Sequence, residues 1–220
     1  GSFHCSFIRV THSIPDTAHI LIKTPVGTIY HGSDFKFDET PHDGKKSDYE
    51  AIKRAGNEGI LCLLSDCLGV ERAGRLPSET NLTLPFEKEI QKTFGKCIVT
   101  TYSSHIARVN QIIAASEKAG RKVCFIGRSF VNAKEVAQKI GYLKMLGATE
   151  VQIEELSQYP DNKLTLIVAG SQGQEESAMA RIANGVHREV RLTKEDTVIF
   201  SSDPIPGNEM FVYDLIDTIS

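Results

Sequence analysis

Short apolar runs alternate with amphipathic segments through the second half of the chain, and this alternation restricts the possible folds more than any other feature. Each run is continuously apolar, as expected of strands that are covered on both faces. Strands separated by helix-length segments form parallel sheets, because each helix carries the chain back to the start of the next strand. The pattern predicts an α/β domain with a parallel, Rossmann-like sheet, whose strands are residues 97–102, 122–127, 164–170 and 197–202.

The segments between these runs have the spacing of helices. In residues 105–120, Ile106, Val109 and Ile113 recur at helical intervals, which places them on one buried face. We expect Ser103 or Ser104 to cap this helix and Gly120 to end it. Two further helices are predicted from apolar stripes, one of Val136, Ile140 and Leu143 and one of Val212, Leu215, Ile216 and Ile219.

The first part of the chain has a different pattern. Residues 6–11, 19–24 and 28–35 alternate or run apolar, which is typical of strands, and the sequence Pro-Val-Gly predicts a hairpin turn between the last two. A polar loop and a short helix ending at Gly56 or Gly59 follow, and residues 59–66 are expected to form a buried strand. We therefore expect two domains, a β-rich unit over residues 1–85 and the α/β unit over residues 86–220.

Length and charge exclude several classes of protein. A chain of 220 residues with 40% hydrophobic content can bury a substantial core. Because 25 basic residues oppose 28 acidic ones, no overall positive field attracts a polyanion, and any nucleic-acid contact must be local. No apolar run approaches the roughly 18 residues that a membrane span requires.

The cysteines indicate the compartment. Five are present without a Cys-x-x-Cys motif, and Cys62, Cys97 and Cys124 lie inside apolar runs, where buried free thiols are common. This pattern favours a reducing, cytoplasmic location. The chain begins Gly-Ser without an initiator methionine, so we expect it to be an excised piece of a longer protein.

Small polar loops follow all four strands of the α/β unit. In a parallel sheet these loops meet at one edge, where backbone N–H groups and helix N-termini can hold anions. The alternative is that they are ordinary turns and caps. No GxGxxG or P-loop motif is present. The candidate phosphate-binding residues at this edge are Ser103, Ser104, His105, Arg108, Arg128, Ser129, Ser171, Gln172 and Gly173.

Three potential metal-site residues lie at strand ends of the first unit. His12 lies in a bend between two strand-like runs, and Asp34 and Asp66 each follow another run. An imidazole with a carboxylate suits zinc or manganese, and an aspartate can bridge two metal ions in a hydrolytic site. The commoner roles are a solvated histidine and turn-forming aspartates.

A series of motifs resembles the ribonuclease J family, which has the metallo-β-lactamase fold and belongs to the β-CASP group. The similarity is collinear from Ile8 to Asn208 and rests on THSIPD, GSDFKFDETP, GILCLLSD, GRKVCFIGRSF, AGSQGQE, RIANG and VIFSSDPIPGN. The resemblance implies a metal-dependent ribonuclease that degrades single-stranded RNA from a 5′-monophosphate end and also cuts internally. It implies that residues 1–85 are a partial metallo-β-lactamase β-sandwich and that residues 86–220 are a β-CASP domain.

The same resemblance assigns roles to individual residues. His12 matches a metal-ligand histidine, and Asp34 matches the catalytic aspartate that bridges both metal ions. Asp66 matches an acidic residue that supports the metal site. The metal implied is zinc, with manganese or magnesium as alternatives. The loops that contain Ser103 to His105, Gly127 to Ser129 and Gly170 to Gly173 match segments that line the RNA channel and the 5′-phosphate pocket.

The chain also departs from the family pattern. The motif His-x-His-x-Asp-His is absent, and Ala107 stands where the family commonly has histidine. A tetrahedral metal site cannot be filled from one histidine and one bridging aspartate. We therefore expect this polypeptide alone to be inactive and, as an exposed half sandwich, to form a homo-oligomer. The alternatives are a non-catalytic RNA-binding or subunit-partner protein that keeps the β-CASP fold, and a nucleotide-binding α/β module.

Overall fold

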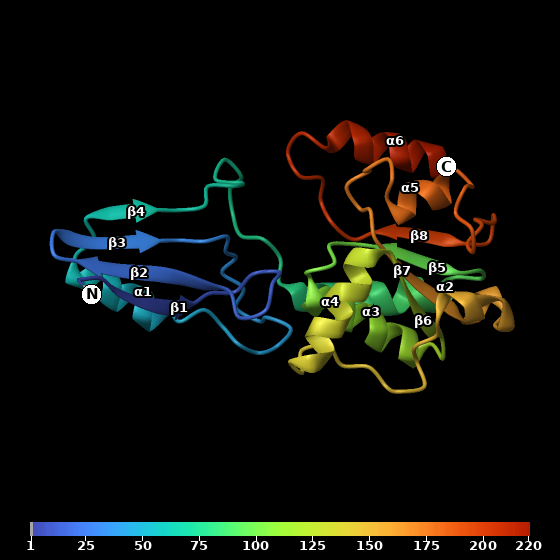
Figure 1. The fold of residues 1–220 in the computed structure, drawn as a ribbon, viewed down its shortest axis with the longest axis horizontal. Coiled ribbons are helices and arrows are strands. Elements are labelled where there is room, and N and C mark those ends of the chain that lie inside the picture. Colours follow the sequence, from blue (N-terminus) through green and yellow to red (C-terminus); the bar gives the residue numbers. More distant parts are fainter. Residues whose placement is uncertain (1) are drawn as a thin grey trace. The chain divides into compact units, whose positions relative to one another are not determined.

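A computed structural model describes residues 2–220, which divide into two compact units between Leu82 and Thr83. The first unit holds a mixed sheet and one α-helix, and the second an all-parallel sheet with helices on both faces (Figure 1). The protein is therefore of the α/β class predicted from the alternation of strands and helices. No helix within residues 2–220 combines the length and the hydropathy needed to cross a bilayer.

The sheet of the first unit has the strand order β1-β2-β3-β4. The first three strands are antiparallel neighbours, and β4 runs parallel to β3. The predicted hairpin is confirmed, because Thr24 pairs with Gly27 across a two-residue turn. The strands are β1 (His4–Arg9), β2 (Ala18–Thr24), β3 (Gly27–His31) and β4 (Cys62–Leu64).

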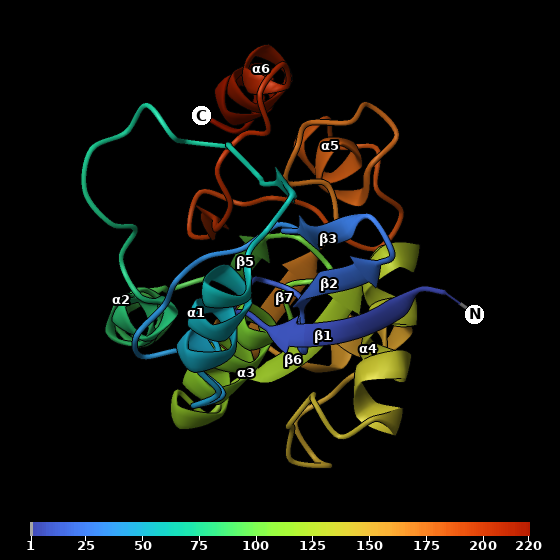
Figure 2. The ribbon, with the colours of Figure 1, turned by 90° about the vertical axis from the view of Figure 1, so that its left-hand side faces the viewer.

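One helix, α1 (Tyr49–Glu58), covers a face of this sheet (Figure 2). The Asp48 side chain caps it by accepting a hydrogen bond from the backbone N–H of Ala51, and the helix ends at Gly59, as predicted. Gly59 has a φ of 92°, which glycine adopts without steric cost. Ala55 of the helix packs against an apolar cluster of β1, β2 and β3, formed by Ile8, Leu21 and Tyr30.

The predicted burial of the fourth strand is wrong. Leu63 is 64% exposed and Leu64 49% exposed, and Cys62 is exposed as well. The physical reason is that β4 is an edge strand, paired only with β3, while the apolar cluster beneath α1 is built on β1, β2 and β3. A continuous apolar run shows that a strand can be buried, but whether it is buried depends on its neighbours.

The second unit confirms the predicted parallel sheet. Its strand order is β6-β7-β5-β8, with every neighbouring pair parallel. The two central strands, β5 and β7, are buried along their whole length, whereas the edge strand β8 is half-buried. The strands are β5 (Cys97–Thr100), β6 (Lys122–Ile126), β7 (Leu164–Val168) and β8 (Thr197–Phe200).

Helices lie on both faces of this sheet (Figures 1 and 2). On one face, α5 and α6 contribute Met179, Ile182 and Leu215 to a core with Leu166 of β7. On the other, α3 and α4 pack against β6, and α2 packs against α3. The helices are α2 (Thr83–Lys92), α3 (Ile106–Lys118), α4 (Arg128–Lys139), α5 (Ala178–Ala183) and α6 (Glu209–Ile219), with short 3-10 helices at Glu79–Leu82, Ile153–Gln158 and Asp161–Lys163.

Two of the three predicted helix stripes are confirmed. Ile106, Val109 and Ile113 of α3 are buried, and α6 buries Val212 and Leu215. The stripe predicted for α4 is wrong, because the helix begins at Arg128, directly after β6, and buries Phe130 and Ala137. This earlier start rotates the buried face, so Val136 and Ile140 are 58% and 62% exposed, and Leu143 is buried beyond the end of the helix.

Candidate functional site

The bend after β1 brings the histidine and the bridging aspartate predicted for the metal site together. His12 Nε2 lies 3.8 Å from Asp34 Oδ2. The His12 side chain is 27% exposed and the Asp34 side chain 78% exposed, so the pair borders solvent. These residues are far apart in the sequence, and the fold places them within reach of one small ligand.

Thr11 holds together the two backbone segments that contain His12 and Asp34. Its backbone oxygen accepts a hydrogen bond of 2.7 Å from the N–H of Lys36, and its hydroxyl donates to the Lys36 oxygen. The N–H of Thr11 donates to the Ser47 hydroxyl at 2.9 Å. Because Thr11 precedes His12 and Lys36 lies two residues after Asp34, these bonds fix the backbone on both sides of the pair.

A strained turn shapes the bend itself. Asp16 is the one non-glycine residue within residues 2–220 that has a positive φ, at 54°. Its carboxylate accepts a hydrogen bond of 2.6 Å from Arg9 Nη1, and this bond lowers the pKa of Asp16. The turn closes through the N–H of Val10, which donates to the Thr17 oxygen. The ion pair thus offsets the cost of a left-handed aspartate.

Asp66, the third predicted residue of the metal site, forms a local turn. It lies in the loop after β4, and its Oδ1 accepts a hydrogen bond of 2.9 Å from the N–H of Leu68. This is the turn-forming role that aspartates commonly have at strand ends. Within the part of the chain that the structure describes, Asp66 belongs to no group of three metal-ligating side chains.

His12 and Asp34 offer part of the ligand set that a metal ion requires. An imidazole nitrogen beside a carboxylate oxygen is a suitable pair of ligands for zinc or manganese. A tetrahedral zinc site takes at least three protein ligands. Across residues 2–220 no group of three or more His, Cys, Asp and Glu side chains could hold an ion. His12 and Asp34 therefore do not complete a metal site by themselves.

The second candidate region is the edge of the parallel sheet where its strands end. The chain leaves β5 through α3 toward β6, and leaves β7 through α5 toward β8. Because β5 and β7 are neighbours and α3 and α5 lie on opposite faces of the sheet (Figures 1 and 2), the loops after these strands diverge. Such a switch point is where open α/β sheets bind ligands.

Gln172 joins the loops around this switch point. Its Nε2 donates to the Tyr102 hydroxyl at 2.9 Å and to the Asp203 oxygen at 3.1 Å. Its Oε1 accepts a hydrogen bond of 2.7 Å from the N–H of Ile205. The Gln172 residue is only 4% exposed, so its amide positions the loops that follow β5, β7 and β8.

Arg108 makes a second connection at this edge. Its Nη1 donates to the backbone oxygen of Ser201 at 2.7 Å and to the Ser201 hydroxyl at 2.8 Å. The Thr101 hydroxyl donates to the same Ser201 oxygen at 2.9 Å. Arg108 is 9% exposed, and its guanidinium thus holds the start of the loop after β8.

The remaining predicted residues of this edge fall into two groups. Ser104, Arg128 and Ser129 are exposed, and the last two lie in the first turn of α4. The buried group consists of His105, Ser171 and Gly173, with Ser103 half-buried. A side chain at Gly173 would collide with the backbone of Phe211, which explains the glycine there. The exposed group therefore presents side chains to solvent, and Ser103 does so in part.

The predicted serine cap of α3 is wrong. His105 is the N-cap, and its Nδ1 accepts a hydrogen bond of 3.3 Å from the N–H of Arg108. The reason is a turn before the helix, in which the N–H of His105 donates to the oxygen of Tyr102. This turn delays the helix until after Ser103 and Ser104.

Tyr102 is the site residue that the sequence did not single out. Its hydroxyl accepts a hydrogen bond from Gln172 and donates to the Asp203 oxygen at 2.9 Å. Burial raises the pKa of Tyr102, and the negative charge of Asp203 raises it further. Its position directly after an apolar strand was the available signal, but an aromatic residue there is equally typical of a strand end.

The second unit, with its parallel sheet and polar loop edge, is a β-CASP domain, which belongs to the metallo-β-lactamase type of protein. The family model described as "Ribonuclease J, beta-CASP domain" matches residues 94–219. The chain belongs to the ribonuclease J family.

Individual relatives agree with this assignment. Ribonuclease J of Thermus thermophilus is 42% identical over 99% of this chain, and that of Synechocystis is 39% identical over 99%. Ribonuclease J2 of Bacillus subtilis is 34% identical over 98%. The chain spans only 38%, 34% and 39% of the length of these three relatives.

A solved structure shares the fold. The crystal structure of a protein of unknown function from Enterococcus faecalis is 15% identical and has a TM-score of 0.54, covering 100% of this chain and 56% of that one. At this identity the similarity concerns the fold alone.

Proposed function

We propose that this chain is the RNA-binding part of a metal-dependent ribonuclease of the J type, which acts on single-stranded RNA with a 5′-monophosphate. The observation that carries the proposal is the switch point between β5 and β7, where Gln172 ties the loops together. The exposed N-terminal turn of α4 follows β6, the other neighbour of β7. Arg128 and Ser129 in that turn are suited to contact phosphates, because a guanidinium and a helix N-terminus both bind anions.

The metal centre of the whole enzyme would use His12 and Asp34. Their separation of 3.8 Å supports a shared ligand, and zinc is the metal we propose, with manganese or magnesium as alternatives. The remaining ligands would come from outside residues 1–220. When bound, such an ion would lower the pKa of a water molecule for attack on a phosphodiester. Degradation from the 5′ end and internal cleavage would both belong to the whole enzyme.

We expect these 220 residues alone to bind RNA without cleaving it. The incomplete donor set within residues 2–220 supports this expectation. The same observation favours the alternative, a non-catalytic RNA-binding or subunit-partner protein that retains the β-CASP fold. The five cysteines, all free thiols, support a cytoplasmic location.

The binding proposal is tested by fluorescence anisotropy with a labelled single-stranded RNA that carries either a 5′-monophosphate or a 5′-hydroxyl. We expect the monophosphate to bind more tightly and Arg128→Glu to weaken its binding about tenfold, since a charged hydrogen bond is lost. Lys139→Glu makes the same charge change at the other end of α4 and serves as the control. Equal effects of the two variants would contradict the proposal.

The fragment proposal is tested by a cleavage assay. The chain is incubated with the 5′-monophosphorylated RNA and Zn²⁺ or Mn²⁺, and the products are separated on a gel. We expect no cleavage. Robust cleavage that disappears in His12→Ala would contradict the proposed incompleteness, whereas the full-length protein is expected to cleave. If the full-length protein binds RNA but also fails to cleave, the non-catalytic alternative is correct.

A further inference from the structure

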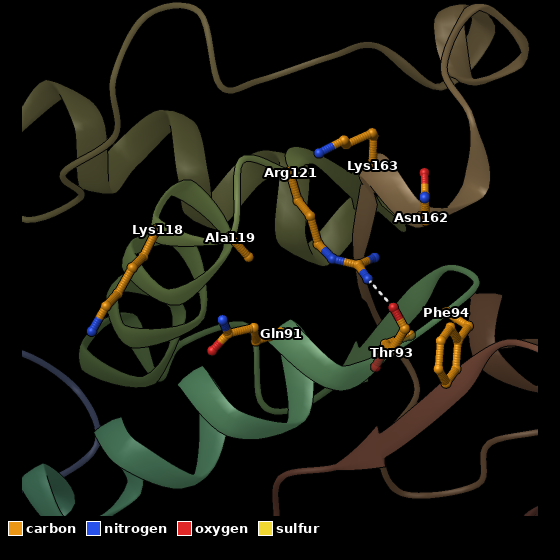
Figure 3. Close-up of a pocket in the computed structure, with 8 residues that line it drawn as sticks. All are labelled: Gln91, Thr93, Phe94, Lys118, Ala119, Arg121, Asn162 and Lys163. Carbon is orange, nitrogen blue, oxygen red and sulfur yellow. Dashed lines mark hydrogen bonds between the residues drawn. The ribbon is translucent and has the colours of Figure 1, made fainter.

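A cavity of about 310 Å³ lies on the second unit at the opposite edge of the parallel sheet, where its strands begin. Figure 3 shows the Arg121 side chain reaching into it between the end of α3 and the segment after α2. A cavity of this size is at the lower end of the range for small-molecule sites. Its eight lining residues are Gln91, Thr93, Phe94, Lys118, Ala119, Arg121, Asn162 and Lys163.

The charge of this cavity is unbalanced. Three of the lining side chains are basic and none is acidic, although the whole chain carries a net charge of −3. Lys118 is partly neutralised by an ion pair of 2.6 Å with Glu87. Lys163 is exposed and makes no ion pair within the described residues. The cavity thus presents uncompensated positive charge.

Arg121 is the centre of this charge. The residue is 5% exposed, and its guanidinium donates only to backbone oxygens, those of Thr93, Gly95 and Leu164. A guanidinium has five N–H donors, so two remain without a partner among residues 2–220. Burial lowers the pKa of Arg121, and the opposing contribution comes from Cys97 and not from a carboxylate. A buried charge without a counterion is costly, and a bound anion would compensate it.

The rim of the cavity adds features that suit a nucleotide. Phe94 is 84% exposed, which is unusual for a large aromatic side chain, and its ring offers a surface on which a base can stack. The amides of Gln91 and Asn162 provide donors and acceptors for base edges. An apolar ring, two amides and unpaired cations are together the groups that recognise a base linked to a phosphate.

We propose that this cavity binds a nucleotide, with its phosphate against Arg121 and Lys163 and its base on Phe94. This site is separate from the RNA-binding edge proposed above, because it lies where the strands begin and that edge lies where they end. The ligand is either a free mononucleotide or one nucleotide of an RNA strand, and the two share the same chemistry.

The experiment titrates the 15N-labelled 220-residue chain with inorganic phosphate, with AMP and with a four-nucleotide RNA, and follows backbone amide signals. The amides of Ala119 and Gly120 report on the cavity, and those of Gly127 and Gly173 on the opposite edge. We expect AMP to shift the first pair. The proposal would be overturned by shifts confined to the second pair. It would also be overturned if neither phosphate nor AMP, each at about 10 mM, shifted any of these signals.

Variants separate the two parts of the ligand. Lys163→Glu should weaken both phosphate and AMP about tenfold, because it replaces attraction by repulsion. Phe94→Ala should weaken AMP about fivefold or more and leave phosphate unchanged, because it removes only stacking. Lys139→Glu is the control for charge, and circular dichroism checks that each variant is folded. Equal weakening by Lys163→Glu and Lys139→Glu would overturn the proposal.

The RNA arm identifies the source of the nucleotide. If the RNA shifts Ala119 and Gly120 and loses affinity in Phe94→Ala, the cavity holds part of a strand. If AMP shifts these two signals and binds more weakly to Phe94→Ala, while the RNA shows neither effect, the ligand is a free nucleotide. Both results support the site. The Arg128→Glu variant changes only the opposite edge of the sheet. It therefore tests the RNA-binding proposal without affecting the test of the nucleotide cavity.

Discussion

The Gln172 side chain donates a hydrogen bond of 2.9 Å to the Tyr102 hydroxyl, and the two residues are 70 positions apart in the chain. This bond crosses the switch point between β5 and β7. It connects the two loops that diverge to opposite faces of the sheet, and through the Asp203 oxygen it also reaches the loop after β8. One buried amide therefore fixes the geometry of the proposed RNA-binding edge.

Replacing this amide should loosen the whole edge. Gln172→Ala leaves the N–H of Ile205 without its acceptor, so we expect the free energy of unfolding to fall by about 1–3 kcal/mol. RNA affinity should fall as well, since the loops lose their common anchor. Urea denaturation followed by circular dichroism and RNA anisotropy measure the two effects. Gln174→Ala, at an exposed position two residues later, is the matched control and should change neither.

The pair formed by His12 and Asp34 should bind a divalent ion weakly. In a background where the exposed Cys5, Cys62 and Cys67 are replaced by serine, calorimetry should detect Zn²⁺ binding that His12→Ala and Asp34→Asn each weaken about tenfold. His4→Ala removes an exposed histidine of β1 and is the control. If all three variants bind Zn²⁺ equally, the pair has no role as ligands.

A buried ion pair should contribute strongly to the stability of the second unit. Lys96 Nζ lies 3.1 Å from Asp196 Oδ2, and both side chains are nearly inaccessible, at 9% and 1% exposed. Asp196→Ala should destabilise the protein by about 3–5 kcal/mol, because it leaves a buried charge with less compensation. Asp161→Ala removes the second and half-exposed partner of Lys96 and should cost about 0–1 kcal/mol. Urea denaturation measures both.

The same pair has a defined pH dependence. Burial lowers the pKa of Lys96, but the hydrogen bonds and charges of Asp161 and Asp196 outweigh this effect, so the pKa is raised above 10.5. A raised folded-state pKa stabilises the protein fully below the ordinary value and loses this contribution as the pH rises through the raised value. The difference in unfolding free energy between wild type and Asp196→Ala should therefore be constant near pH 7 and shrink above pH 10.5. A constant difference up to pH 11.5 would contradict this assignment.

The cysteines should divide into two reactivity classes. Burial raises the pKa of the Cys97 and Cys124 thiols to about 12, so neither forms the reactive thiolate near neutral pH. Cys5, Cys62 and Cys67 are exposed. Mass spectrometry after treatment with iodoacetamide at pH 8 should show alkylation at these three in the native protein and at all five in urea. Native alkylation of Cys97 would indicate that β5 opens readily.

The exposed strand β4 should promote self-association. It lies at the edge of its sheet with Leu61, Leu63 and Leu64 exposed, and an unpaired apolar edge can pair with a second copy. We expect light scattering to detect a homo-oligomer, and Leu63→Lys to raise the concentration needed for association about tenfold. Leu84→Lys, at a leucine of α2 that is also 64% exposed, is the matched control. A monomer at all concentrations would contradict this prediction.

Local sequence patterns predicted most of the helices and strands and the fold class. Continuous apolar runs separated by helical stripes predicted parallel strands with helices on both faces, because such strands need cover on both sides and the helices between them can provide it. The same local signals located the hairpin at Thr24 and Gly27 and the end of α1 at Gly59. The motifs around His12 and Asp34 marked two residues that the structure places 3.8 Å apart.

The burial of individual strands and the contacts between distant segments depended on how the elements pack together. The exposure of Leu63 follows from the place of β4 at a sheet edge, and the bond between Gln172 and Tyr102 follows from the adjacency of β5 and β7. The Arg121 guanidinium, which has no carboxylate partner within residues 2–220, lies where three backbone segments meet. Sequence periodicity records which faces of an element are apolar, whereas these contacts depend on strand order, which local patterns do not encode.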